Sequence, residues 1–172
     1  MKKGLLFTAF AVITFTMNAQ ATFGATAGYI SATSKIDNLQ GQSFSSSIAG
    51  FFAGITLEIE AGNRFYIQPE LHYTNIDNLN FLRVPIFAKY YVSDNEKFYL
   101  QGGPSITYTL EEISDDFTKF NIGLGLGLGY NFTEQLYVDS KAALQINNYY
   151  TGIDNFKSRL NFVTIALGYN LN

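Results

Sequence analysis

Residues 122–132 read IGLGLGLGYNF, with glycine at every second position from Gly123 to Gly129. Successive side chains of a β-strand point to opposite faces, so as a strand this segment has one continuous apolar face and one almost bare face. A dinucleotide-binding loop is excluded, because its G-x-G-x-x-G pattern would need glycine where Leu128 stands. Since glycine weakens a strand interior, we expect the bare face to make room for bulky groups of the next strand.

The same two-residue period runs through most of the chain beyond its N-terminal segment, and no convincing amphipathic helix is found. Turn-forming residues divide this region into eight candidate strands. These are residues 22–33, 47–60, 65–74, 81–92, 98–109, 118–132, 136–147 and 157–171. Short connections alternate with mostly longer polar ones, among them residues 75–80, as in outer-membrane barrels. The predicted fold class is therefore all-β, an eight-stranded antiparallel up-and-down transmembrane β-barrel.

The N-terminus has the three parts of a secretory signal peptide. Lys2 and Lys3 precede a short apolar run, and Ala19-Gln20-Ala21 gives the small-x-small pattern of a cleavage site. A membrane anchor is the alternative, but the run is shorter than the ~20 residues that a spanning helix needs. We expect a signal peptide at residues 1–21, cut after Ala19 or Ala21, and one barrel domain at residues 22–172.

Charge and composition exclude several classes of partner. The chain has 11 basic and 14 acidic residues, and loss of Lys2 and Lys3 would make it more acidic, which argues against a nucleic-acid partner. It contains no cysteine, so an exported domain would hold together without disulfides. Hydrophobic residues make up 47% and aromatic residues 16% of the sequence. An exported, aromatic-rich chain of this kind is a secreted β-domain or an outer-membrane barrel.

Aromatic residues near the strand ends are expected to form two girdles at the membrane interfaces. The periplasmic girdle would hold Phe23, Phe65, Tyr90, Phe98, Tyr130, Phe132 and Tyr169, and the outer girdle Tyr73, Tyr108 and Phe120. We expect a monomer surrounded by outer-membrane lipid in a Gram-negative-type cell, with both termini on the periplasmic side.

Residues 80–110 carry a recognisable pattern. Leu82-Arg83-Val84-Pro85 and Lys89-Tyr90 lead through a tight turn into an aromatic-rich strand that runs to Gly103-Pro104. In these residues the chain resembles the small outer-membrane β-barrel domain family described as PorT-like, and in size and architecture it is similar to OmpX/OmpA-type barrels. The resemblance implies a location and a fold, because such barrels serve different functions.

Charged residues occupy the strand faces opposite the oily ones, and in a barrel these faces line the lumen. The expected lumen ionic cluster is Glu58, Glu60, Glu70, His72, Arg83, Lys89, Asp139 and Lys141. In the expected pairing His72 lies across from Arg83. Lys141 is expected to form a cluster with Asp139, Glu58 or Glu60, and with Lys89. The glycines from Gly123 to Gly129 are expected to lie opposite Tyr137, Asp139 and Lys141 in the next strand. A salt-bridged filling explains these charges better than an ion path, a proton-linked site or a catalytic group, because barrels this small are filled.

No cofactor, metal or catalytic site is predicted. A single histidine without cysteine makes a poor zinc site, and nothing marks a nucleophile for a Ser-His-Asp arrangement. The acidic residues 111–116 lack the spacing and glycine of an EF-hand, so a solvated loop is favoured over a calcium site. In the last outer loop, Tyr149, Tyr150 and Phe156 lie among polar residues and are the candidate partner-binding residues.

Three functional hypotheses remain. The first is a non-enzymatic integral outer-membrane β-barrel that acts through its external loops in surface interaction or envelope support. The alternative is a narrow transport channel or an accessory of an export machine. A soluble lipocalin-like carrier is the third, and it would have an apolar inward face around a ligand cavity and a polar outward face.

Overall fold

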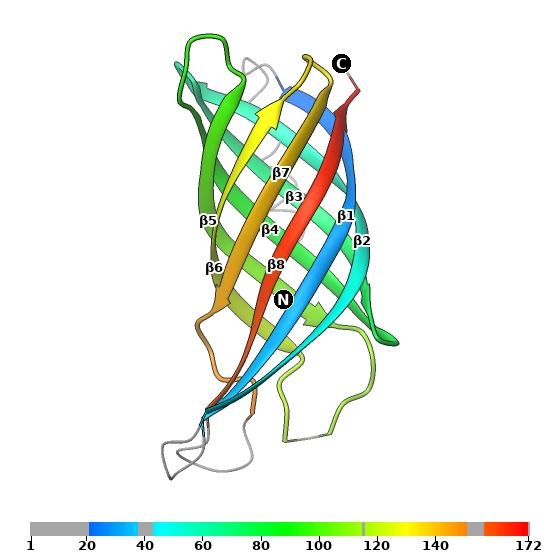
Figure 1. Ribbon diagram of the computed structural model, residues 1–172. Coiled ribbons are helices and arrows are strands. Elements are labelled where there is room, and N and C mark those ends of the chain that lie inside the picture. Colours follow the sequence, from blue (N-terminus) through cyan, green and yellow to red (C-terminus); the bar gives the residue numbers. More distant parts are fainter. Residues whose placement is uncertain (1–20, 38–42, 115, 151–156, 172) are drawn as a thin grey trace, which may run out of the picture.

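The computed structural model describes residues 21–37, 43–114, 116–150 and 157–171 as one closed barrel (Figure 1). Its strands are β1 (Ala21–Asp37), β2 (Ser43–Gly62), β3 (Phe65–Ile76), β4 (Leu79–Tyr91), β5 (Phe98–Thr109), β6 (Phe120–Asn131), β7 (Leu136–Gln145) and β8 (Lys157–Asn170). Each strand pairs antiparallel with its sequence neighbours, and β1 pairs with β8 to close the ring. This confirms the predicted fold class. Within the described ranges, no helix is long and apolar enough to cross a membrane.

The two ends of the barrel differ in their connections. The end that carries Ala21 and Asn170, named here the terminal end, lies at the top of Figure 1 with the turns after β2, β4 and β6. The opposite end, the loop end, carries the connections after β1, β3, β5 and β7. The predicted signal peptide, residues 1–21, lies outside the described residues except for Ala21.

The connection between β3 and β4 is shorter than predicted. We expected a loop over residues 75–80, but only Asp77 and Asn78 lie outside the two strands. Both have positive φ, 45° and 66°, as a type I′ hairpin turn requires. The right-handed twist of the two strands is compatible with this tight turn, so their pairing continues to Ile76 and Leu79.

The outward face is apolar along every strand. Leu124, Leu126 and Leu128 of β6 are all exposed, and Leu126 keeps 71% of its surface accessible. Every aromatic residue predicted for the two girdles is also exposed. Tyr29 and Phe51, which the sequence analysis did not include, form a further outward ring pair with centroids 5.8 Å apart. An apolar outer surface of this kind needs lipid, and it excludes the lipocalin-like alternative.

The lumen has two chemically distinct halves. Toward the loop end an apolar core fills it, consisting of Ile30, Ala32, Phe52, Ile76, Phe81, Ala143, Phe162 and Ala166. The buried charged side chains lie toward the terminal end, whereas uncharged polar residues such as Thr109 and Gln145 are buried beside the apolar core. An ionic filling was expected from the sequence, and the apolar half was not identified, because Phe52 and Phe81 lie on the same strand faces as predicted lumen charges and differ from them only in their level in the barrel.

Candidate functional site

A buried ionic network crosses the lumen from β7 to β3. Nζ of Lys141 lies 2.6 Å from Oε1 of Glu70 and 3.0 Å from Oδ2 of Asp139. Nε2 of His72 lies 2.9 Å from the other carboxylate oxygen of Glu70. All four side chains are buried. Because β3 and β7 are four strands apart in a ring of eight, the Lys141–Glu70 pair joins opposite walls of the barrel.

Two glutamines complete the surroundings of the carboxylates. Nε2 of Gln68 donates a hydrogen bond of 2.7 Å to Glu70, and Nε2 of Gln101 donates one of 3.5 Å to Asp139. Both glutamines are buried on the lumen face. The sequence analysis omitted them because they are uncharged, although the two-residue period places them on the same face as Glu70 and Asp139. Carboxylates held by several donors inside a protein form a structural network.

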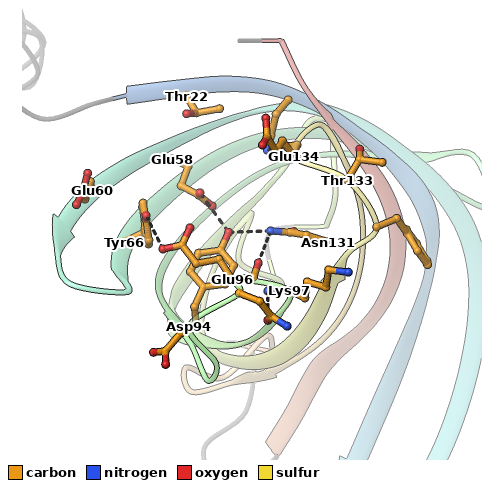
Figure 2. A pocket seen from close by; sticks show the side chains of 14 residues that line it. Thr22, Glu58, Glu60, Tyr66, Asp94, Glu96, Lys97, Asn131, Thr133 and Glu134 are labelled. Carbon is orange, nitrogen blue, oxygen red and sulfur yellow. Dashed lines mark hydrogen bonds between the residues drawn. The ribbon is translucent and has the colours of Figure 1, made fainter.

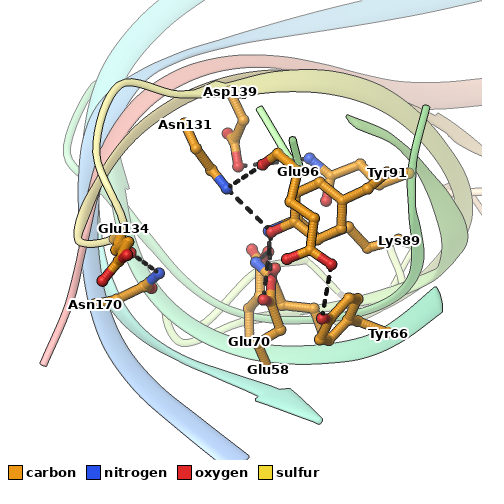
Figure 3. A network of polar contacts seen from close by, with 12 residues as sticks. Glu58, Tyr66, Glu70, Lys89, Tyr91, Glu96, Asn131, Glu134, Asp139 and Asn170 are labelled. Atoms are coloured by element: carbon orange, nitrogen blue, oxygen red, sulfur yellow. Dashed lines mark hydrogen bonds and ion pairs between the residues drawn. The ribbon is translucent and has the colours of Figure 1, made fainter. Parts of the chain in front are cut away.

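A second cation lies nearer the terminal end. Lys89 of β4 makes an ion pair with Glu58 of β2, and its Nζ lies 3.9 Å from the centroid of the Tyr99 ring. The rings of Tyr91 and Tyr137 are 5.0 and 5.6 Å away. Figure 3 shows Lys89, Glu58 and Tyr91 inside the ring of strands. Aromatic faces attract a desolvated cation, so these rings help to hold Lys89 in the lumen.

Arg83 is buried without a carboxylate at ion-pair distance among the described residues. The register pairs it with His72, as the sequence predicted. Its guanidinium lies over the ring of Phe162, 4.8 Å from the centroid, at the boundary between the polar and apolar halves. Buried Nε and Nη1 have no hydrogen-bond partner. Among the described residues Arg83 thus makes no ion pair with the Lys141 network, although it lies beside His72, and an aromatic contact helps to place it.

Glu60 lies outside the buried network. It is exposed and lines a cavity of about 680 Å³ at the terminal end, together with Tyr66, Glu96 and Asn131 (Figure 2). A register shift between Glu60 and Gly62 marks the end of regular pairing with β3. The sequence analysis assumed that the face of β2 continued into the lumen as far as Glu60, but the barrel has already opened at that level. Lys89 and its tyrosines lie beneath this cavity.

The glycine face of β6 provides space, as predicted, but only part of that space is used by the following strand, β7. The register pairs Gly127 with Lys141, as predicted, and a Cβ at Gly127 would lie 2.9 Å from Cγ of Lys141. At Gly129 a Cβ would lie 2.2 Å from the ring of Tyr99, and at Gly125 it would lie 2.8 Å from the ring of Phe87.

The two rings come from β5 and β4, which precede β6, whereas the prediction assigned the space to the following strand. Tyr137, which was expected beside the β6 glycines, lies instead over Gly168 of β8. The cause is geometric: a lumen side chain can lean over either neighbouring strand or, as Phe87 of β4 does, reach past one, and period-two parity does not determine which.

Two loops meet at the loop end through aromatic residues. The rings of Tyr149 and Tyr150 each lie 5.2 Å from the ring of Phe117, and the amide of Thr118 donates a 2.9 Å hydrogen bond to the carbonyl oxygen of Tyr149. Burial raises the pKa of the Tyr149 hydroxyl. The third predicted residue, Phe156, lies outside the described residues. Phe117 was not predicted from the sequence, because it belongs to an earlier loop, and no sequence pattern shows the bridge to Tyr150 or the ring contacts that bring it to the two tyrosines.

Comparison with known proteins identifies the family. Residues 5–172 match the model of the outer membrane protein beta-barrel domain. The chain belongs to this family. The family match confirms the resemblance seen in the sequence. No curated protein sequence matches the chain significantly.

Solved structures share the fold of this outer-membrane barrel. Neisserial surface protein A has a TM-score of 0.53 and 18% identity, and the match covers 88% of this chain and 99% of that one. Ail of Yersinia pestis, solved with the heparin analogue sucrose octasulfate, has a TM-score of 0.52 and 14% identity, with 88% and 99% covered. At these identities the similarity shows the fold alone.

The described part of this outer-membrane barrel contains no group of three or more His, Asp or Glu side chains arranged to hold a metal ion. In the loop after β5, Glu111 accepts hydrogen bonds from Asn80, and Glu112 pairs with Lys119 at 3.1 Å. These two carboxylates therefore have protein partners. The described geometry contains ion pairs and aromatic contacts as its main chemical features.

Proposed function

We propose that the protein is a non-enzymatic integral barrel of the outer membrane that acts through its loop end in surface interaction or envelope support. The observation that carries this proposal is the Lys141–Glu70 pair across the lumen. It lies between the Lys89–Glu58 pair on one side and an apolar core with Phe81 on the other. An eight-stranded barrel is only wide enough to hold its own side chains, and here they occupy it.

A diffusion channel would need these layers to separate. Tyr91, which lines the cavity at the terminal end, and Lys89 beneath it are both buried, which supports a vestibule above a closed lumen. Water and small ions would then have to pass the Lys141 network and the phenylalanines of the core. The transport alternative is therefore the less well supported of the two.

The surface at the loop end supports a binding function. Phe117, Tyr149 and Tyr150 fix two loops against each other, and Phe117 remains 37% exposed. Tyrosine and phenylalanine held in this way are effective contact residues, because little side-chain entropy is lost on binding. We expect the loop end to face the outside of the cell and both termini to face the periplasm, as the short and long connections indicate.

The ligand of Ail does not suit this surface. A heparin analogue is strongly anionic, whereas the loop after β5 carries Glu111, Glu112 and Asp116 against Lys119. Like charges would repel such a ligand. The partner that fits better is neutral or cationic and presents groups for aromatic contact.

Two measurements test the proposal. In planar bilayers the purified protein should give no sustained conductance. In the source bacterium, a deletion strain should regain normal surface attachment and detergent resistance with wild-type protein but not with Phe117→Ser/Tyr150→Ser. The matched control, Asp94→Ser/Lys97→Ser, changes two residues of the terminal end and should restore both properties. Sustained conductance would favour the transport alternative, and full function of the loop-end variant would overturn the surface role.

A further inference from the structure

The strands β1, β2 and β8 continue past the rim at the loop end. β1 pairs with both neighbours out to Asp37, whose partners are Ser43 of β2 and Lys157 of β8. On its other side, β2 loses its partner early, because β3 ends at Ile76, which pairs with Gly50. Figure 1 shows the three strand ends converging below the barrel, apart from the β3–β4 turn. Residues 43–49 therefore form an edge strand, paired with β1 alone among the described residues.

The opposite edge of this projection is covered. The amide of Tyr149 donates to the carbonyl oxygen of Ser158, and the amide of Ser158 donates to Asn148 Oδ1, each at 2.8 Å. These contacts satisfy backbone groups of β8 beyond the end of β7. The edge of β2 has no corresponding loop against it in the described structure.

The β2 edge also lacks the usual protection against pairing. Its sequence, SFSSSIA, contains no charged residue and no proline. Proteins ordinarily protect exposed edges with lysine, proline, a bulge or a covering loop, because free backbone N–H and C=O groups invite another strand. Residues 45–49 are all exposed. This edge is available for strand addition, the mode in which main-chain hydrogen bonds supply the affinity.

The middle of the edge, Ser45-Ser46-Ser47, reads the same in both directions. If two copies pair antiparallel about a two-fold axis at Ser46, the register places Ser46 opposite Ser46 and Ser45 opposite Ser47. Hydroxyl residues opposite each other are favourable cross-strand pairs. No like charges meet. We propose that this edge pairs with the same edge of a second copy of this chain.

The geometry determines where the second copy must be. Two copies in one membrane point in the same direction along the membrane normal. Because barrel strands are tilted ~35–45° from this normal, the facing edge strands of the two copies would cross at roughly twice that angle. They cannot form an antiparallel ladder. Copies in two facing membranes are related by an axis parallel to the membrane planes, which makes their edges antiparallel. The pairing therefore joins two membranes, and each copy stays a monomer in its own.

This inference rests on the proposed function in one respect, the outward orientation of the loop end. A single contact of seven residues is weak, because an isolated strand pair is marginally stable in water. Many copies on two facing surfaces would raise the strength of the contact by avidity. Vesicles at high protein density are therefore the appropriate sample, and their clustering is the appropriate measurement.

The test substitutes Ser46, the residue that lies opposite its own copy in the proposed pairing. Proteoliposomes with wild-type protein should cluster, with a several-fold rise in apparent diameter by light scattering. Ser46→Lys and Ser46→Glu vesicles should each stay dispersed, because the new charge faces its own copy. An equal mixture of the two should cluster again. Ser34→Lys is the matched control: Ser34 pairs with Ser46 at the same level but lies on the central strand, so its vesicles should cluster as wild type does.

Restored clustering in the mixture supports pairing between copies and shows that both variants are folded. If the mixture stays dispersed, or if wild-type vesicles never cluster, the inference is overturned. The inference would also be overturned if Ser46→Lys vesicles clustered when mixed with wild-type vesicles but stayed dispersed when mixed with Ser46→Glu vesicles. These outcomes are independent of the conductance and complementation measurements, so failure here can be distinguished from failure of the proposed function.

Discussion

Lys141 and Glu70 lie on opposite walls of the barrel and meet at 2.6 Å in its lumen. Asp139 and His72 extend the contact on either side. Such a network gives the strands a polar core in place of an apolar one, and its stability depends on every member having a partner. If one charged side chain is removed, the remaining ones stay buried in the lumen without their partner.

The first prediction concerns that dependence. Lys141→Met should lower the free energy of unfolding by about 3–5 kcal/mol, because Glu70 and Asp139 would remain buried without their cation. Urea unfolding in micelles measures the loss. Lys119→Met is the matched control, since Lys119 makes an exposed ion pair with Glu112 and should cost about 0–1 kcal/mol. Equal losses for the two lysines would contradict the structural role of the lumen network.

The second prediction concerns the space above a glycine. A Cβ at Gly168 would lie 1.9 Å from Cζ of Tyr137, so Gly168→Ala should destabilise the barrel by about 1–3 kcal/mol through overcrowding. Adding Tyr137→Leu should recover part of that loss, which a double-mutant cycle can quantify. At Gly62 the nearest group is 4.0 Å away, and Gly62→Ala should be close to neutral. Additive effects of Gly168→Ala and Tyr137→Leu would show that the two residues do not compete for space.

The features of the fold that depend on neighbouring strands were predictable from the sequence. Period-two alternation fixes which face of each strand is apolar, and turn residues fix which strands pair, so the eight strands and the Gly127–Lys141 register followed. The exceptions arose at the loop end. There β1 and β2 extend past the predicted limits of residues 33 and 47, because a largely polar, serine-containing segment still pairs in a projecting sheet.

Contacts across the lumen were not predictable in the same way. Which residues of opposite walls meet depends on the tilt and stagger of all eight strands together, a property that no single strand reveals. Asp139 was therefore expected beside Lys141, because both residues lie on the same strand. The contact with Glu70, which lies on the opposite wall, was not expected. The phenylalanine-rich half of the lumen went unnoticed for a related reason: Phe81 and Phe162 lie far apart in sequence, and the sequence pattern does not show that their rings meet 6.3 Å apart.

The third prediction concerns the pH dependence of the loop after β5. Glu111 accepts hydrogen bonds from the amide and side chain of Asn80, which lower the pKa of its carboxyl group. A carboxyl whose folded pKa is lowered stabilises the loop above the ordinary glutamate pKa, and that contribution is lost as pH falls through the folded value. As pH is lowered, the NMR chemical shift of the Asn80 amide should therefore change only below the pH range in which glutamate side chains ordinarily titrate.

Two variants check the assignment. Glu111→Gln should abolish the low-pH change at Asn80, because the titrating carboxylate is gone. Glu112→Gln should leave it intact, since Glu112 pairs with Lys119 instead. A titration of the Asn80 amide in the normal glutamate range, or one that survives Glu111→Gln, would refute the contact.

The last prediction tests which face of β6 meets lipid. Leu126 is 71% exposed at the middle of the glycine-rich strand, where it pairs with Gly102 of β5 and Ala142 of β7. Leu126→Lys should cost about 2–4 kcal/mol in a bilayer, because the ammonium group would lie in hydrocarbon near the midplane. Leu171, equally outward but beyond the end of β8, is the matched position, and Leu171→Lys should cost only about 0–1 kcal/mol near the interface. Unfolding from lipid vesicles compares the two. If the mid-strand lysine is tolerated as well as the terminal one, Leu126 does not contact hydrocarbon, and the glycine face of β6 would then have to be the one turned to the membrane.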